Sequence, residues 1–179
     1  VGSEPTTGFE AMLALMRSQN VDEVLEALAQ WPMPILNFAF ADSHGRFGYH
    51  AVGHVPTRKA RNHGFRPAID PDHEWGEPYA FEDLPHLVDP ECNWVATAKN
   101  SPWGGRGDYL ALGGWSEGYR FRRIKERIEA LEIHTLESVG AIQADAVHGR
   151  GQDLAAIVAE VALKARNRRL RELGELLRD

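Results

Sequence analysis

The sequence predicts an α+β fold in which antiparallel strands are accompanied by several flanking helices. Three observations lead to this prediction. Residues 37–58 have the apolar runs and the turn residues of a β-hairpin. Two segments with helical periodicity precede the hairpin, and at least three follow it. Strands and helices that occur in separate runs are typical of α+β domains.

Two amphipathic helices are predicted before the hairpin. The first begins at the capping-box pattern Thr7-x-x-Glu10, and the second begins at Asn20-x-x-Glu23. The apolar face expected for the first helix consists of Phe9, Met12, Leu13 and Met16. The corresponding face of the second consists of Val21, Val24, Leu25 and Leu28.

The hairpin is predicted from strands at residues 35–41 and 47–52 with a turn between them. Asp42 can accept hydrogen bonds from the backbone of the turn, and Gly45 can adopt a positive φ. Pro56 lacks an N–H group, so we expect the second strand to end near Gly53.

Residues 58–90 are rich in Pro, Gly, Asp and His and show little periodicity, which predicts an extended surface loop anchored by Trp75, Tyr79 and Phe81. A further strand is expected at residues 94–98. Helices are then predicted from Tyr119 to about residue 131, after a Thr135 cap, and in a last segment. The apolar positions of the last helix are Leu154, Ile157, Val158 and Val161.

Length and composition favour one domain that spans residues 1–179. The chain has 179 residues and 43% apolar residues, enough for one sizeable core. Its formal charge of −6 argues against a nucleic-acid partner, because phosphate binding needs a basic surface. The basic cluster at residues 166–171 lies beside the acidic residues Glu172, Glu175 and Asp179 and is interpreted as a solvated helix face.

Several other classes of site or protein are disfavoured by the sequence. No apolar run is long enough to cross a membrane, so no membrane partner is expected. The single cysteine, Cys92, cannot form an internal disulfide and is predicted to be a small buried residue beside a strand. The eight histidines do not have the spacing of a metal site, although His50 and His54 would share one face of a strand.

Four motifs, in order, resemble the β chains of the penicillin acylase family. The first is N-x-x-x-A-D-x-x-G-x-x-G-Y-x-x-x-G-x-x-P-x-R, which begins at Asn37. The second is V-D-P followed by N-W-V-A-T-A-K-N-S-P, which begins at Val88. The third and fourth are Tyr119-Arg120-x-x-Arg123-Ile124 and Gln143-x-Asp145. Together they extend over residues 37–145.

The resemblance implies the αββα sandwich of the N-terminal-nucleophile (Ntn) amidohydrolases, of which this chain would be a fragment. In that family the nucleophile is a Ser, Thr or Cys at the first position of the β chain, and its own α-amine is the base. Val1 has no nucleophilic side chain. We therefore expect the chain to be an internal or C-terminal part of such a β chain, without the upstream nucleophile region. Its partners would be the acylase α chain, the missing part of the β chain and a small-molecule amide.

The resemblance also implies roles for individual residues. The family has two asparagines where this chain has Lys99 and Asn100, and the first of them donates to the tetrahedral oxyanion. Either residue is a candidate donor here, and loss of the oxyanion site is an open alternative. Arg120 matches an arginine that positions this site, the alternative being an exposed arginine paired with Glu117. Asp108 lies near the position at which the family has an aspartate ligand of its structural calcium ion, and the resemblance implies no cofactor that the reaction requires.

Two hypotheses about function follow from the resemblance. The first is that the parent protein is an amidohydrolase that cleaves a linear amide through an acyl-enzyme. The second is that the chain is a non-catalytic structural or binding domain derived from an acylase. Many members of the family are periplasmic or secreted, so the resemblance favours those compartments. The acyl group of the substrate is not predicted by this sequence.

Overall fold

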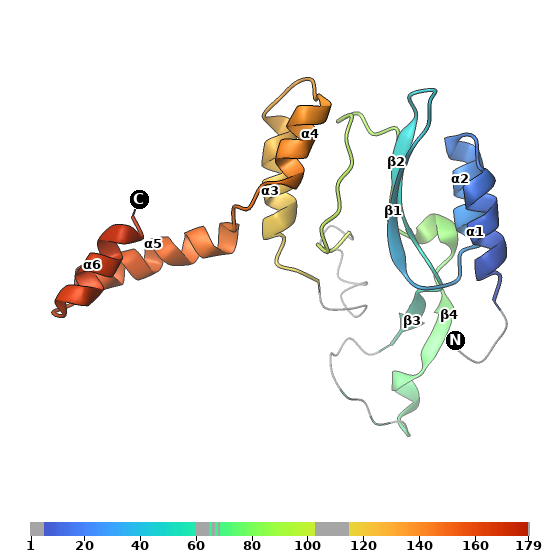
Figure 1. The fold of residues 1–179 in the computed structure, drawn as a ribbon. Helices are drawn as coiled ribbons and strands as arrows, with labels where there is room; N and C mark the ends of the chain where they lie inside the picture. Colours follow the sequence, from blue (N-terminus) through green and yellow to red (C-terminus); the bar gives the residue numbers. More distant parts are fainter. Residues whose placement is uncertain (1–5, 60–64, 66, 68, 103–114, 179) are drawn as a thin grey trace. The chain divides into compact units, whose positions relative to one another are not determined.

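The computed structural model describes residues 6–59, 65, 67, 69–102 and 115–178 (Figure 1). The chain divides into two compact units, Val1–Trp115 and Ser116–Asp179. The first is called the hairpin unit and the second the helical unit. Each is described by itself, and the expectation of a single domain over residues 1–179 stays a prediction.

The predicted hairpin is confirmed and forms the centre of the first unit. Strands β1 (Leu36–Ala41) and β2 (Phe47–Val52) pair antiparallel, with Leu36 opposite Val52 and Ala41 opposite Phe47. Gly45 in the turn has a φ of +89°, as expected for a residue without a Cβ. The predicted end of the second strand is also confirmed, because β2 stops at Val52.

The region expected to be an extended loop contains three short strands. Strand β3 (Pro56–Arg58) pairs antiparallel with β4 (Trp75–Pro78), and β5 (His86–Val88) pairs with the free edge of β2. Two 3-10 turns lie beside them, at Pro71–His73 and Phe81–Asp83. The loop prediction was wrong for these strands because segments of three or four residues are too short to show a period of two.

Two helices, α1 (Gly8–Arg17) and α2 (Val21–Ala29), lie beside the hairpin in the first unit (Figure 1). The predicted cap of α2 is confirmed, because the Asn20 side chain accepts a hydrogen bond from the Glu23 N–H and donates one to its carboxylate. The predicted start of α1 is confirmed, because Thr7 is its N-cap residue, but the expected capping hydrogen bond does not form. The Thr7 hydroxyl donates instead to the Gln30 carbonyl at 2.9 Å, because the chain turns back beside it.

The buried face of α1 also differs from the prediction. Ala11 is its fully buried residue, whereas Phe9 and Met16 are 79% and 75% exposed. A small residue allows close contact between helix backbones, which leaves the larger apolar side chains on the outer side. In α2 the predicted face is confirmed at Val21 and Leu28, which are both fully buried.

The core of the hairpin unit lies against β2. Tyr49, Ala51, Val55 and Leu84 form a buried cluster, and Val95 packs against it from the segment that follows β5. The strand expected at residues 94–98 does not form, because among the described residues no strand pairs with this segment. Cys92 is exposed, which makes the prediction of a buried cysteine wrong.

The helical unit contains the three helices that the sequence predicted and a fourth, which begins within the basic cluster at residues 166–171. Helix α3 ends close to the predicted boundary, Thr135 caps α4 as expected, and the basic cluster at residues 166–171 leads into the last helix. The four are α3 (Tyr119–Glu129), α4 (Leu136–Gln143), α5 (Gly149–Leu163) and α6 (Arg168–Leu176).

Burial in the helical unit is sparse. Neither α3 nor α4 has a fully buried residue, and α5 buries only Ala159 and Ala162. The apolar residues of the last predicted face, such as Ile157 and Val161, are 61% and 69% exposed. Among the described residues, no helix combines the length and apolarity needed to cross a membrane.

Candidate functional site

The residues of the first motif meet across the hairpin. The Tyr49 hydroxyl on β2 donates a hydrogen bond to the Asn37 side-chain oxygen on β1. Burial raises the pKa of Tyr49 to about 12. The hydroxyl therefore keeps its proton at neutral pH and acts as a donor that joins the two strands.

The aspartate of the same motif connects the turn to helix α2. The Asp42 carboxylate accepts hydrogen bonds from the backbone N–H groups of His44, Arg46 and Val21, at 2.8, 3.0 and 3.2 Å. Burial raises the pKa of Asp42, but these N–H groups outweigh burial, so the pKa lies below its ordinary value. Asp42 is therefore an ionised acceptor that holds the turn against the first turn of α2.

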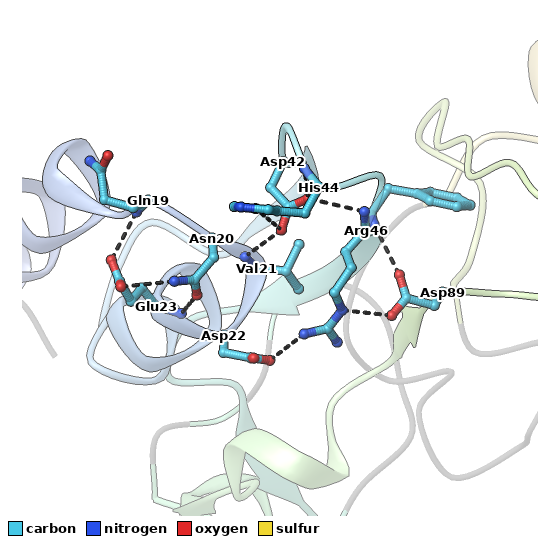
Figure 2. A network of polar contacts seen from close by, with 10 residues as sticks. Gln19, Asn20, Val21, Asp22, Glu23, Asp42, His44, Arg46 and Asp89 are labelled. Carbon is cyan, nitrogen blue, oxygen red and sulfur yellow. Dashed lines mark hydrogen bonds and ion pairs between the residues drawn. The ribbon is translucent and has the colours of Figure 1, made fainter.

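Arg46 joins this turn to the second motif, as Figure 2 shows. Its Nη1 donates to Asp22 Oδ1 at 2.7 Å, and its Nε donates to Asp89 Oδ2 at 2.9 Å. The other oxygen of Asp89 accepts from the Phe47 N–H at 3.0 Å. The Phe47 N–H and then the Arg46 guanidinium lower the pKa of Asp89. These contacts bring together residues that are 43 positions apart.

The predicted oxyanion residues lie at the end of the second motif. Lys99 is exposed and has a φ of +60°, so the chain turns here and the expected strand alternation between Lys99 and Asn100 does not apply. Asn100 is half-buried, and its side-chain oxygen accepts from the Ala98 N–H at 3.0 Å. Among the described residues, its Nδ2 makes one long contact, 3.5 Å from the Ser101 carbonyl. The Ala98 N–H thus fixes the orientation of the Asn100 amide by binding its oxygen.

Arg120 lies in the first turn of α3, in the helical unit. It lines an open hollow of about 210 Å³ together with Tyr119, His148 and Arg150. Glu117, the residue considered as its alternative partner, forms an ion pair with Arg150 at 3.0 Å. Arg120 belongs to the helical unit and residues 99–100 to the hairpin unit, so the positioning role of Arg120 toward them stays a prediction.

The third and fourth motifs meet in a charge cluster. The Arg123 guanidinium donates to Asp145 Oδ2 from Nη2 at 2.7 Å and from Nε at 3.1 Å, and Arg127 Nε lies 3.6 Å from the same oxygen. The Val147 N–H donates to Asp145 Oδ1 at 2.9 Å. The Arg123 guanidinium, followed by this N–H, lowers the pKa of Asp145. The sequence contained both motifs but no signal that they would pair.

Asp108, the candidate calcium ligand, lies outside the described residues. Within the described part of the chain, no three His, Cys, Asp or Glu side chains come together in a way that could hold a metal ion. The calcium position therefore stays a prediction.

A ring stack that contains the buried His50 and the exposed His86 was not predicted. The ring centroids of His50 and Phe81 lie 3.8 Å apart, and the two ring planes are nearly parallel, at 6°. The centroid of the His86 ring lies 5.0 Å from that of His50. Burial lowers the pKa of His50, which favours its neutral form. The pairing of β2 with β5 places His50 opposite His86, so the stack depends on a strand that the sequence did not reveal.

The comparisons with known proteins identify the family. The sequence pattern of the family described as penicillin amidase matches the chain over residues 1–179. The chain belongs to the penicillin amidase family. This membership confirms the resemblance that the four motifs indicated.

One curated relative in the penicillin amidase family is the penicillin acylase 2 proenzyme of Pseudomonas sp. (strain SE83). It is 26% identical over 145 residues, which are 80% of this chain and 19% of the relative. A solved structure, the thermostable penicillin G acylase of Alcaligenes faecalis, superposes with a TM-score of 0.73 at 20% identity. That match covers 97% of this chain and 32% of the other. The predicted α+β fold of the Ntn-hydrolase type is thereby confirmed.

Proposed function

We propose that the parent protein is an Ntn amidohydrolase that hydrolyses a linear amide through an acyl-enzyme, and that this chain supplies part of its oxyanion site. The observation that carries the proposal is the family match along the whole chain. The folded contacts between motif residues support it, because the motifs occur here as paired structural elements.

The proposed reaction needs an N-terminal nucleophile. A Ser, Thr or Cys at the start of a processed chain would attack the amide carbonyl, and its α-amine would accept the hydroxyl or thiol proton and deliver it to the leaving amine. Water would then release the acid and regenerate the nucleophile. We place the nucleophile in a part of the protein outside residues 1–179.

Within this chain, Asn100 is the stronger candidate for the oxyanion donor. The Ala98 N–H binds its side-chain oxygen, which gives the N–H groups of the amide a defined direction, and within the described residues Nδ2 makes one long contact, with the Ser101 carbonyl. A neutral amide also leaves the α-amine free to act as base, whereas the Lys99 ammonium beside that amine would disfavour its protonation. Lys99 would then stabilise the oxyanion only through its charge at longer range, or would not affect the reaction rate.

The proposed partners are the remaining parts of the acylase. The curated relative is described as a proenzyme, and this chain covers 19% of its length. We therefore propose that the chain functions together with an acylase α chain and the remainder of the β chain. The substrate would be a small-molecule amide.

The test uses the full-length gene. The expressed protein is analysed by intact mass and N-terminal sequencing, and then assayed with chromogenic phenylacetyl, glutaryl and long-chain acyl amides. We expect a processed chain that begins with Ser, Thr or Cys and that hydrolyses at least one of the amides. Asn100→Ala should lower kcat about 100-fold, the usual cost of losing one oxyanion donor. An unprocessed protein without activity would contradict the proposal.

A matched pair of lysine variants tests the role of Lys99. Lys99→Met removes the charge at the family's asparagine position, and Lys125→Met removes one from the exposed surface of α3. If Lys99→Met and Lys125→Met both change kcat only slightly and to the same extent, Asn100 remains the proposed donor. A fall in kcat for Lys99→Met alone would assign the role to Lys99.

The second candidate function is a non-catalytic domain derived from an acylase. The observation that favours it is Lys99 itself, because the family pattern has an asparagine in that place. Absence of a Ser, Thr or Cys at any processing junction of the full-length protein would support this second candidate.

A further inference from the structure

The segment between β5 and the candidate oxyanion site has an unusual backbone. Three residues other than glycine have a positive φ in the described chain, and all of them lie here: Asp89 at +46°, Asn93 at +58° and Lys99 at +60°. Side chains with a Cβ rarely adopt this conformation, and they keep it where the surrounding structure holds them in it. The segment of residues 89–100 therefore depends on contacts that fix its course.

Its entry point is held by a set of hydrogen bonds. The Asp89 N–H donates to the Phe47 carbonyl at 2.9 Å, and both Asp89 carboxylate oxygens are bound, one by the Phe47 N–H and the other by Arg46 Nε. Pro90 follows directly, and Asp89 has a φ of +46° in place of the extended conformation usual before a proline. Further along, Val95 packs against the buried cluster around Tyr49, which anchors the middle of the segment.

Arg46 connects this entry point to helix α2 of the hairpin unit. Its Nε and Nη1 point at two different carboxylates, Asp89 after β5 and Asp22 on α2 (Figure 2). Its backbone is held as well, because its N–H donates to Asp42 and its carbonyl accepts from the Asp42 N–H. A guanidinium has several donors in a fixed plane and can serve two acceptors at once.

We propose that Arg46 is a positioning residue for the candidate oxyanion site, because it holds Asp89 in the left-handed conformation from which residues 89–100 run to Lys99 and Asn100. This inference rests on the proposed function. Arg46 does not touch the reacting atoms in this role. It acts through Asp89 on the placement of the Asn100 amide, and a small misplacement of such a group costs much of its catalytic effect.

The experiment uses the processed full-length protein and the variant Arg46→Met, which keeps the apolar stem but removes the donors. We expect kcat per active site to fall about tenfold with KM unchanged within twofold, since a displaced donor affects the transition state more than substrate binding. Active sites are counted by the acyl-enzyme burst. Hydrogen exchange followed by mass spectrometry should show faster exchange in peptides that cover residues 47 and 89–100.

The matched control is Asp22→Asn, which removes the other carboxylate partner of Arg46 and leaves the Asp89 contact in place. This variant should keep both kcat and the exchange of residues 89–100. A second test variant, Asp89→Asn, loses the charge pair but keeps an acceptor for the Phe47 N–H, and asparagine tolerates a positive φ. It serves if Arg46→Met does not fold, and it should lower kcat in the same direction.

The outcomes separate the two proposals. If the wild-type protein has activity but both test variants keep kcat within twofold, the inference about Arg46 is overturned and the proposed function stands. An equal fall in kcat for Asp22→Asn would also overturn it, because the effect would then be one of general stability. A wild-type protein without amidase activity overturns the proposed function, and the catalytic role of Arg46 with it.

Discussion

The hairpin unit and the helical unit hold their family motifs in different ways. In the hairpin unit the motif residues lie on paired strands over a buried cluster, and Leu28, Val21 and Val52 beside them are fully buried. In the helical unit the two motifs are joined by the charge pair of Arg123 and Asp145, and neither α3 nor α4 buries a residue completely. We therefore expect the first unit to be sensitive to changes of volume and the second to changes of charge.

The largest expected effect is a cavity in the hairpin unit. Leu28 is fully buried, so Leu28→Ala should lower the free energy of unfolding by about 3 kcal/mol through lost burial and the cavity that remains. The matched change in the helical unit is Leu136→Ala, at a side chain that is 89% exposed, with an expected effect within about 0.5 kcal/mol. Denaturant unfolding followed by circular dichroism measures both, and equal losses would remove the proposed difference between the units.

A smaller effect is expected from added volume at a glycine. A Cβ at Gly48 would lie 2.6 Å from the Leu87 carbonyl oxygen on β5 and 2.7 Å from the Phe40 ring. Gly48→Ala should therefore destabilise the protein by about 2 kcal/mol, because β5 must move away from β2. A Cβ at Gly140 on α4 would meet nothing within 4 Å, so Gly140→Ala should stabilise the helix by about 0.5–1 kcal/mol.

The same denaturation curves decide this second prediction. If the two glycine variants shift stability in the same direction, the close approach of β5 to Gly48 is not important for stability. Faster hydrogen exchange of residues 86–88 in Gly48→Ala, with no change in α4, would locate the effect at the strand pair.

The smallest effect concerns acid stability of the helical unit. The pKa of Asp145 in the folded protein lies below its ordinary value of 3.8, so the unfolded chain binds the proton more readily. The stabilisation is therefore present above 3.8 and is lost as the pH falls through the folded pKa. Asp145→Asn removes this contribution, so its stability should differ from the wild type at neutral pH and converge with it in acid.

Thermal unfolding of both proteins between about pH 6 and pH 2 measures this convergence. Asp153→Asn is the control, because its carboxylate is largely exposed and lies 3.6 Å from Arg122. A difference between wild type and Asp145→Asn that does not change with pH would show that the charge of Asp145 is not what joins the two motifs.

Elements that depend on neighbouring residues were predictable from the sequence. The hairpin turn follows from Asp42 and Gly45, and the caps at Asn20 and Thr135 follow from side chains three residues from the N–H groups they bind. The fold class and family could also be predicted, because the four motifs occur in order along the chain. Thr7 is the N-cap residue of α1 as predicted, but its capping hydrogen bond does not form for a reason that the local sequence does not contain, namely the Gln30 carbonyl 23 positions away.

The placement of the candidate site was less predictable. Lys99 and Asn100 were found from the motif, but the strand expected before them does not form, and the turn at Lys99 changes how both side chains are presented. Arg46 gave no signal, because it occupies a variable position of the pattern and its partners Asp22 and Asp89 lie 24 and 43 positions away.

The sequence by itself determined the α+β class, the hairpin with its turn, the main helix starts and the family, because each depends on periodicity, on caps or on ordered motifs. Only the tertiary structure decided that β5 pairs with β2, that Arg46 binds Asp89 and that Arg123 binds Asp145. Such contacts join residues far apart in the chain. Folding removes N–H groups, carboxylates and guanidinium groups from part of their water, and these groups then bind one another in its place.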